Sequence, residues 1–564
     1  MKKILFDTLK RYATLILSIL AVIGIVLLVT FLKPRSELEN QFLFGLSLRR
    51  LVLGLIFIFF WTVNVTVIFW LGLRWSKWGI NIENKVTAWI PSARVLLYFV
   101  TLTAATIWIA MIPPIIGLFK FLRSMSEQLD GLFLWLLSLG IFLIVLIRIT
   151  YGSVVYEKKG AHAVEQFILA AVLFIITFFL YAHFAVLIGW VDKDKYAFWD
   201  LLVGQFMQGK LYLTNPPYTH DLTMYKGNWY VPMPPLPAIL MMPLAWLIGA
   251  ENINTSYFSM VFSAVNGVLV FLILGNINDR KWIQISQSGI FLLVALFLFG
   301  TPHLWVGISG RGWYVSQVLT VTFLALAIYS ALHSWTPWLA GIFIAIAMTA
   351  RPNSLMTWPF VFAISMQLLK ENQGEVNLKQ AFYWSLKTVM PIAIAIMGLS
   401  LYNYLRFENI LDFGYTTVNA GSDIVYNVQT WGVFSPHFIS RNLKVMFFEM
   451  PWINLNSRWP IEPSATGMSV FLTTPALIYL FHRYPKHWWI IGGWAAILFN
   501  IALLSLYHTT GAHQFGYRYI LDMLVPVIAM LAVGMNRKIP WHFVVLVLAS
   551  IVINIYGADW FMNG

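Results

Sequence analysis

The feature that most constrains this chain is an apolar run of about twenty residues that recurs from one end to the other. One such run, residues 168–188, contains no Asp, Glu, Lys or Arg. A helix of about twenty apolar residues is long enough to cross the hydrocarbon core of a bilayer. Closed barrels are excluded, because their strands alternate apolar and polar residues whereas these runs are apolar throughout. The sequence therefore predicts an all-α polytopic membrane protein.

Composition excludes several other classes of protein. The 564-residue chain is 59% hydrophobic and 11% charged, too apolar for the surface of a soluble globular protein. Its net charge of +14 fits the Lys and Arg that membrane proteins concentrate in cytoplasmic loops, so we expect no nucleic-acid partner. The absence of cysteine excludes disulfides, thiolate metal sites and cysteine nucleophiles.

The apolar runs divide the chain into two predicted parts. Residues 1–160 form a block of four spans, whose default interpretation is a packing or docking module. Residues 161–564 carry about eleven further spans and two structured external loops, 191–255 and 405–465. The spans are predicted near residues 12–32, 51–72, 94–115, 132–151, 168–190, 256–275, 283–300, 313–333, 336–350, 354–369, 382–404, 466–482, 487–506, 518–535 and 540–557.

The short loops predict the orientation. Lys and Arg in the first eleven residues place the N-terminus in the cytoplasm, and alternation then places both long loops outside. Arg35, Arg49 and Arg50 conflict with this scheme, because they fall in an outside loop. The first span lacks a small-residue cleavage site and is interpreted as an uncleaved anchor. We expect a multi-pass protein of a prokaryotic plasma membrane.

The first long loop contains signals of local structure. KGN between short aromatic runs predicts a small hairpin, and residues 195–208 predict an amphipathic helix. Four prolines within six residues precede an apolar stretch that is too short to span, which favours a helix lying in the outer interface. The loop is therefore expected to be folded and to press against the membrane surface.

Acids and cations on the external side predict a site for a substrate that is half lipid and half polar. Cations would bind a lipid phosphate, and a carboxylate would accept a proton. The acids are Asp192, Asp194, Asp200 and Asp221, and the cations are Lys193, Lys195, Arg311, Arg351, Arg406 and Arg518.

Each of these residues also has a structural interpretation. Asp192 and Asp194 alternate with lysines, as in a solvated segment, and Asp200 fits a helix surface. Asp221 suits a turn cap, and Arg351 a membrane-boundary anchor. A later patch, HTTGAHQFGYRYILD, contains His513, Tyr517, Arg518 and Asp522 where a helix enters the membrane. At helical spacing Arg518 and Asp522 are i,i+4 neighbours and are expected to pair.

Several segments carry a family resemblance in their order along residues 165–560. They are GKLY, YKGNWYVPMPPLPA, AMTARPNSL, LYNYLRFENILDFGY, GAHQFGYRYILD and NIYGADW. This set resembles the GT-C glycosyltransferases, and most closely the bacterial members related to dolichyl-phosphate-mannose protein mannosyltransferases (glycosyltransferase family 39). The four N-terminal spans lie outside the resemblance.

The resemblance implies an inverting hexosyl- or pentosyltransferase that takes its sugar from a polyprenyl phosphate on the outer face. It implies a first-loop acid as base, here Asp194 or Asp192, with Asp200 next. Many relatives carry an Asp-Glu or Asp-Asp pair, where this chain has Asp-Lys-Asp-Lys. Arg351 and Arg518 would bind the phosphate, and Asp221 would orient the acceptor or close the loop. The remaining substrate-binding candidates are Tyr230, Arg406, His513 and Tyr517. No cofactor or metal is implied, and the acceptor is a glycan, lipid or protein.

Two other functions share part of this pattern. A transporter or flippase of a lipid-linked glycan would also place cations near a lipid phosphate, but it predicts polar residues along a path through the bilayer. A polysaccharide polymerase or ligase would use the same donor with a different loop pattern. Few charges lie at the centres of the predicted spans, which favours the transferase.

Overall fold

The computed structural model describes residues 159–190, 196–453, 460–511, 513–535 and 539–563. Two compact units, residues 1–172 and 173–564, make up the chain, and the described residues lie mainly in the second. The block of four spans predicted for residues 1–160 lies outside the described residues, apart from the start of one helix. The described part is mainly helical, as expected for an all-α membrane protein.

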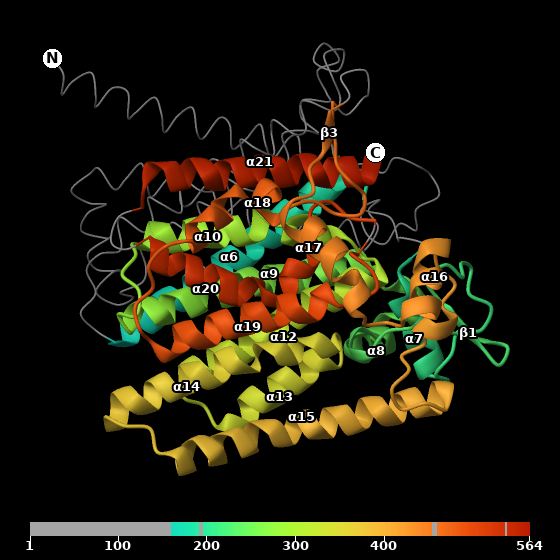
Figure 1. The fold of residues 1–564 in the computed structure, drawn as a ribbon, viewed down its shortest axis with the longest axis horizontal. Coiled ribbons are helices and arrows are strands. Elements are labelled where there is room, and N and C mark those ends of the chain that lie inside the picture. Colours follow the sequence, from blue (N-terminus) through green and yellow to red (C-terminus); the bar gives the residue numbers. More distant parts are fainter. Residues whose placement is uncertain (1–158, 191–195, 454–459, 512, 536–538, 564) are drawn as a thin grey trace, which may run out of the picture. The chain divides into compact units, whose positions relative to one another are not determined.

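The helices of the bundle run side by side in Figure 1. They are α6 (Lys159–Leu187), α9 (Thr255–Asp279), α10 (Gln287–Phe299), α11 (His303–Ile308), α12 (Gly312–Leu332), α13 (Pro337–Met348), α14 (Trp358–Gln373), α15 (Leu378–Phe407), α18 (Val470–Thr473), α19 (Trp488–Ser505), α20 (Leu524–Gly534) and α21 (Trp541–Asn563). Short 3₁₀ helices η3 (Pro352–Thr357), η6 (Pro475–Leu480) and η7 (Arg518–Met523) precede α14, follow α18 and precede α20. α12 packs against α9, α13 and α14 and is the most buried of the long helices.

Five helices of the described part are long and apolar enough to cross a membrane: α9, α12, α15, α19 and α21. The expectation of eleven spans in this part of the chain is therefore not met. The other predicted runs contain shorter helices, because glycine and proline interrupt them. Gly300 and Pro302 end α10, Pro352 follows α13, and Pro475 separates α18 from η6. Proline removes a backbone donor and clashes with the preceding turn, so a continuous helix stops there.

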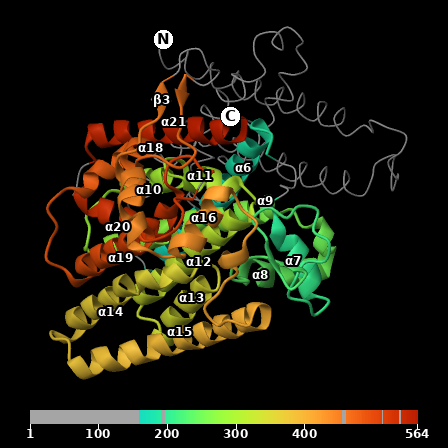
Figure 2. The same cartoon turned by 45° about the vertical axis from the view of Figure 1, so that its right-hand side comes forward.

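The two long loops gather at one end of this bundle (Figures 1 and 2). The first contains α7 (Phe198–Phe206), the hairpin β1 (Thr223–Tyr225) and β2 (Asn228–Tyr230), α8 (Leu236–Ile248) and η2 (Ala250–Asn252). The second contains η4 (Tyr415–Thr417), α16 (Ser422–Trp431), η5 (Pro436–Phe438), α17 (Ile439–Phe447), β3 (Trp452–Ile453) and β4 (Ile461–Glu462). The predicted hairpin and first-loop helices are confirmed. Lys226 and Gly227 form the hairpin turn with φ of 46° and 80°, as a tight turn of this kind requires.

Hydrogen bonds fasten the two loops to each other. The Thr223 hydroxyl donates to the Gly414 carbonyl at 2.6 Å. The Asp221 amide donates to the Asn419 carbonyl at 2.7 Å, and the Asn419 amide to the Leu222 carbonyl at 2.8 Å. The first loop is also tied to the bundle, because the indole N–H of buried Trp199 donates to the carbonyl of Gly312 at 2.8 Å. Both loops therefore form one cap over the start of α12.

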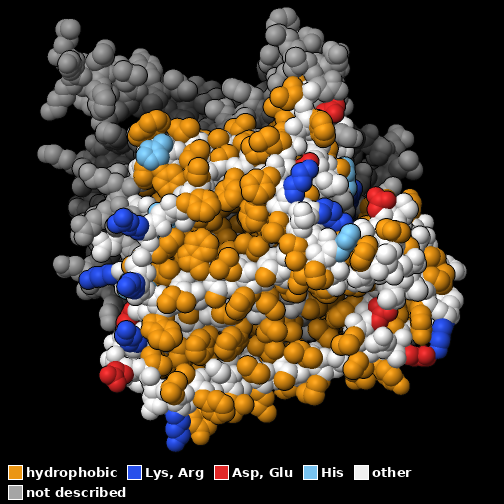
Figure 3. All heavy atoms as spheres, in the orientation of Figure 1, with side chains coloured by type: hydrophobic (Ala, Val, Ile, Leu, Met, Phe, Trp, Pro, Cys, Tyr) orange, Lys and Arg blue, Asp and Glu red, His pale blue; other side chains and the backbone are white. Residues whose placement is uncertain are grey.

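The opposite end of the bundle is rich in basic residues. Figure 3 shows an apolar face along the helices, with Lys and Arg side chains gathered at the edge far from the loops. The basic residues at these helix ends are Arg280, Lys281, Lys370, Lys379, Arg483 and Lys486. An apolar band with a basic edge is compatible with a membrane protein.

One close helix contact gives a test of the packing. A Cβ at Gly341 in α13 would lie 2.3 Å from the carbonyl oxygen of Thr388 in α15, whereas a Cβ at Gly398 in α15 meets no atom within 4 Å. We expect Gly341→Ala to lower the free energy of unfolding by about 1–3 kcal/mol, because α13 and α15 must move apart. Gly398→Ala is the matched control and should be neutral or slightly stabilising. Thermal unfolding in detergent measures both, and equal midpoints would show that the two helices do not touch at Gly341.

Candidate functional site

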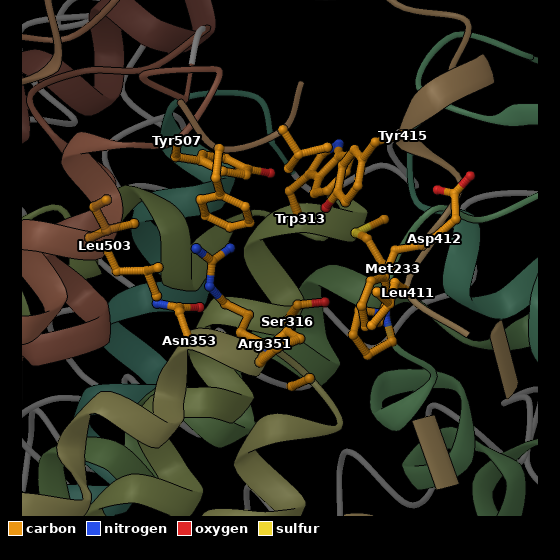
Figure 4. Close-up of a pocket in the computed structure, with 17 residues that line it drawn as sticks. Met233, Trp313, Ser316, Arg351, Asn353, Leu411, Asp412, Tyr415, Leu503 and Tyr507 are labelled. Carbon is orange, nitrogen blue, oxygen red and sulfur yellow. The ribbon is translucent and has the colours of Figure 1, made fainter. Parts of the chain in front are cut away.

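A cavity of about 350 Å³ lies between the loop cap and the bundle. Its walls come from five parts of the chain: the end of the first loop, the start of α12, the turn between α13 and η3, the second loop, and the end of α19. Figure 4 shows Trp313, Tyr415 and Tyr507 along one side, with the Arg351 guanidinium reaching toward them. Most of the lining is apolar or aromatic. Its volume is in the range of small-molecule sites.

Arg351 is the only Lys or Arg among the described residues that line the pocket. It precedes Pro352 and has the extended backbone that proline imposes on its neighbour, with φ −147° and ψ 112°. Its Nη2 donates to Oδ2 of Asp522 at 2.9 Å, and Nδ2 of Asn353 donates to the same oxygen at 2.8 Å. The Nε–H of Arg351 is buried without a hydrogen-bond partner. The guanidinium is therefore held by Asp522 on one side, and 13% of the Arg351 side chain stays accessible.

Asp522 pairs with Arg351 and not with Arg518, so the predicted i,i+4 pair is wrong. The segment that carries both residues is the 3₁₀ helix η7, which has three residues per turn. Residues four apart consequently point in different directions. Arg518 instead donates from Nη1 to Gln317 at 2.7 Å and from Nε to the Gly511 carbonyl at 3.1 Å.

Tyr519 connects the two arginines behind the pocket. The guanidinium carbon of Arg351 lies 5.1 Å from the centre of its ring, and that of Arg518 lies 4.6 Å away. Tyr517 is wholly buried beside them and packs edge-on against Tyr519 at 5.7 Å. The structure thus brings together the predicted residues Arg351, Tyr517 and Arg518, but of these only Arg351 lines the pocket.

Two further tyrosines line the pocket. The ring of Tyr415 stacks on Trp313 with centroids 6.3 Å apart, and Tyr507 packs edge-on against Tyr519 at 6.0 Å. Burial raises the pKa of both the Tyr415 and Tyr507 hydroxyls above the ordinary value. Both therefore remain protonated near neutral pH. A side-chain hydrogen bond joins the two hydroxyls, which leaves one O–H donor of the pair for a ligand oxygen.

The predicted acids occupy different places. Asp192 and Asp194 lie outside the described residues. Asp200 is only 2% exposed, in the first turn of α7 within the core of the first loop, and does not line the pocket. Asp221 lies directly behind the pocket wall, because the Trp313 indole N–H donates to its Oδ2 at 3.3 Å. Among the described first-loop acids, Asp221 is thus the one that contacts a pocket-lining side chain.

Arg406 and Tyr230 form a structural contact beneath the hairpin. The buried guanidinium of Arg406 donates to the Val231 carbonyl at 2.7 Å and to Oδ1 of Asn403 at 3.0 Å. Tyr230 packs on Phe407 with ring centroids 5.2 Å apart. Neither residue lines the pocket. We assign Arg406 the role of anchoring the first loop to the end of α15.

His513 belongs to a second cluster, around Arg311. Its ring packs on Trp560 and Phe561 at 5.4 and 5.2 Å. The Arg311 guanidinium lies over Phe561 and also over Trp190 and Tyr196, at 5.1, 5.3 and 5.4 Å. Trp190 and Tyr196 are the described residues on either side of the segment that contains Asp192 and Asp194. Both flanks of that segment are therefore held at Arg311, two residues before Trp313 of the pocket wall.

Asp412 is a pocket residue that sequence reasoning missed as a candidate. Its carboxylate accepts hydrogen bonds from the Gly414 amide and the Thr416 hydroxyl, both at 2.7 Å. The residue lies in the LYNYLRFENILDFGY segment that carries part of the family resemblance. Its position in that segment could have marked Asp412 as a candidate site residue. An Asp just before a glycine turn is, however, equally typical of a turn cap.

Comparisons with known proteins do not extend this description. No protein family, curated protein or solved structure matches the chain.

His508 gives the site a pH-dependent stability. It is buried against Tyr415 and Tyr507, and burial lowers its pKa to about 4. Below about pH 6.5 the unfolded chain binds a proton that folded His508 does not, so stability is complete above pH 6.5 and falls as the pH decreases toward 4. We expect this histidine to remove about 2 kcal/mol of stability between pH 6.5 and 5. Thermal unfolding of wild type and His508→Gln across that range isolates the effect, and parallel curves would contradict it.

Proposed function

We propose that this protein is a membrane glycosyltransferase. It moves a sugar from a polyprenyl-phosphate donor to an acceptor hydroxyl on the external membrane face and inverts the anomeric carbon. The main support for the proposal is the pocket at the loop end of the bundle. There Arg351, which donates one hydrogen bond to Asp522, faces aromatic side chains. The order of segments that resembles the GT-C glycosyltransferases supports it.

The mouth of the pocket suits a ligand with a long apolar tail. Leu411 lines the pocket and is 80% exposed, and Phe434 lines it and is 54% exposed. Nearby on α15, Leu405 and Leu401 present an exposed apolar surface of the kind that faces lipid. A prenyl chain in the bilayer can therefore contact the apolar rim that Leu411 and Phe434 form at the mouth while its phosphate lies at Arg351.

Charge favours a single phosphate at this place. Arg351 donates to Asp522 from Nη2 alone, and its side chain remains 13% exposed, so the guanidinium can form a charge-assisted hydrogen bond with one phosphate oxygen. The hydrogen-bonded pair of Tyr415 and Tyr507 hydroxyls can add one neutral donor. Together these groups can bind the phosphate of the donor and stabilise the negative charge that develops when it leaves.

The reaction is a single displacement. The acceptor oxygen forms a bond to the anomeric carbon as the bond from that carbon to the phosphate oxygen breaks. The proton of the acceptor hydroxyl passes to a carboxylate, and the electron pair of the broken bond leaves with the polyprenyl phosphate. We assign the base to Asp194 or Asp192, because the flanks of their segment lie at Arg311 beside the pocket wall. Asp221 holds Trp313 in that wall through its indole N–H.

The membrane orientation follows from the same arrangement. The basic edge opposite the loops supports an orientation with that edge in the cytoplasm and the loop cap and pocket outside. We propose a multi-pass plasma-membrane protein with its active site on the external face. This orientation matches the N-terminus predicted to be cytoplasmic.

The assignment of the base can be tested by replacing carboxylates with amides. We expect Asp192→Asn and Asp194→Asn together to lower kcat by roughly 10²-fold or more while donor affinity is retained, because general-base catalysis is removed. Adding Asp200→Asn should change little further, since that side chain is enclosed in α7 packing. The control is Asp423→Asn, an exposed acid of the second loop that does not line the pocket.

The assay uses proteoliposomes with a radiolabelled polyprenyl-phosphate sugar and a mixed acceptor fraction. Covalent transfer of label by wild type supports the transferase, whereas movement of label across the bilayer without bond change would identify a flippase. Full transfer activity in the triple variant would reject the assigned base.

A further inference from the structure

The pocket and the layer behind it contain both aspartates and arginines. Arg351 and Asp412 line the pocket. Four more charged side chains contact lining residues or the rings behind them. Asp522 bonds to Arg351, and Asp221 to Trp313. Arg518 lies against Tyr519, and Arg441 donates to the His508 carbonyl beside Tyr507. Arg406 also interacts electrostatically with Asp412 and Tyr415 of the lining. Among the described residues, three aspartates thus offset most of the charge of four arginines at the site.

Asp522 is responsible for much of this balance. It is wholly buried, and its Oδ2 accepts from both Arg351 and Asn353 at 2.9 and 2.8 Å. Two donors hold the carboxylate in place beside the guanidinium. Arg351 thus keeps its hydrogen-bond direction toward the pocket, while its net attraction for anions is largely cancelled. An acid at this position lowers the affinity of the site for a ligand with several negative charges, because the acid repels them.

We propose that the pocket selects its ligand by the number of negative charges it carries, and that Asp522 is the residue that sets the limit at one. The inference rests on the proposed function and refines it. A sugar-linked prenyl monophosphate is a phosphodiester with one negative charge, whereas prenyl diphosphates carry more. Each additional charge must approach Asp522 and Asp412 in a poorly hydrated space, where like charges repel strongly.

The inference excludes one class of donor. Lipids that carry a sugar on a diphosphate differ from the proposed donor mainly in that extra charge. The apolar rim and the aromatic walls would accept both kinds of donor, because the two lipids carry the same prenyl chain and the same sugar. Discrimination must then come from the acid paired with Arg351, which makes Asp522 a specificity-determining residue.

The test compares two probes that differ in head-group charge. Farnesyl methyl phosphate is a diester with a single negative charge, and farnesyl diphosphate carries roughly three near neutral pH. Binding of each to the full-length chain in a neutral detergent is measured for wild type, Asp522→Asn, Asp412→Asn and Asp423→Asn. We expect wild type to bind the diester at least about tenfold more tightly than the diphosphate.

Replacing Asp522 or Asp412 should weaken the preference for the diester over the diphosphate. We expect Asp522→Asn and Asp412→Asn each to reduce the affinity ratio by about tenfold, and the exposed control Asp423→Asn to leave it unchanged. Asp412→Asn keeps the inference testable if Asp522→Asn does not fold. Asp412 lies on a loop turn, and the Thr416 hydroxyl can reverse to accept from the new amide.

The outcomes of this experiment distinguish a failure of the charge limit from a failure of the proposed glycosyltransferase function. An unchanged ratio in both variants, or a wild type that prefers the diphosphate, overturns the charge limit and leaves the proposed function standing for a different donor. A wild type that binds neither probe overturns the proposed function, and the charge limit with it.

Discussion

The ion pair between Arg351 and Asp522 is the interaction on which the site depends. It joins two turns that are 171 residues apart in the chain, and Asn353 reinforces it from the same turn as Arg351. Asp522 is fully buried, so the pair replaces hydration that both charges lose on folding. Removing one partner of such a pair typically costs about 3–5 kcal/mol, because the other charge is left buried alone. The ion pair therefore helps to hold the turn that carries Arg351 and Asn353 in its place at the pocket.

The rest of the pocket depends on how the two loops are held. Two backbone hydrogen bonds and one from the Thr223 hydroxyl join residues 221–223 to residues 414–419, so the loops form one cap. Arg406 anchors that cap to the end of α15 through the Val231 carbonyl. The second loop is also bound to the end of α19, since the Ser435 amide donates to the Leu506 carbonyl at 2.8 Å. The cavity is thus enclosed by segments that are far apart in sequence, and neither loop could form it alone.

Local features were predictable from the sequence, and long-range ones were not. The KGN turn, the first-loop helices and the helical apolar runs follow from turn chemistry and periodicity, which act within a few residues. Proline and glycine shortened several of the expected spans. Pairing of Asp522 with Arg351 could not be read from spacing, because η7 is a 3₁₀ helix and its partner lies on another turn. Arg406 was predicted from charge alone, whereas its carbonyl partners are tertiary contacts. Arg351 was selected from sequence and lines the pocket.

A cryo-EM structure with bound donor analogue tests the central claim most directly. The full-length chain would be reconstituted in lipid nanodiscs with a non-hydrolysable polyprenyl phosphonate sugar. We predict phosphonate density within hydrogen-bonding distance of the Arg351 guanidinium, with the prenyl chain leaving past Leu411 and Phe434. Phosphonate density elsewhere on the chain, with this pocket free of ligand at saturation, would contradict the assignment.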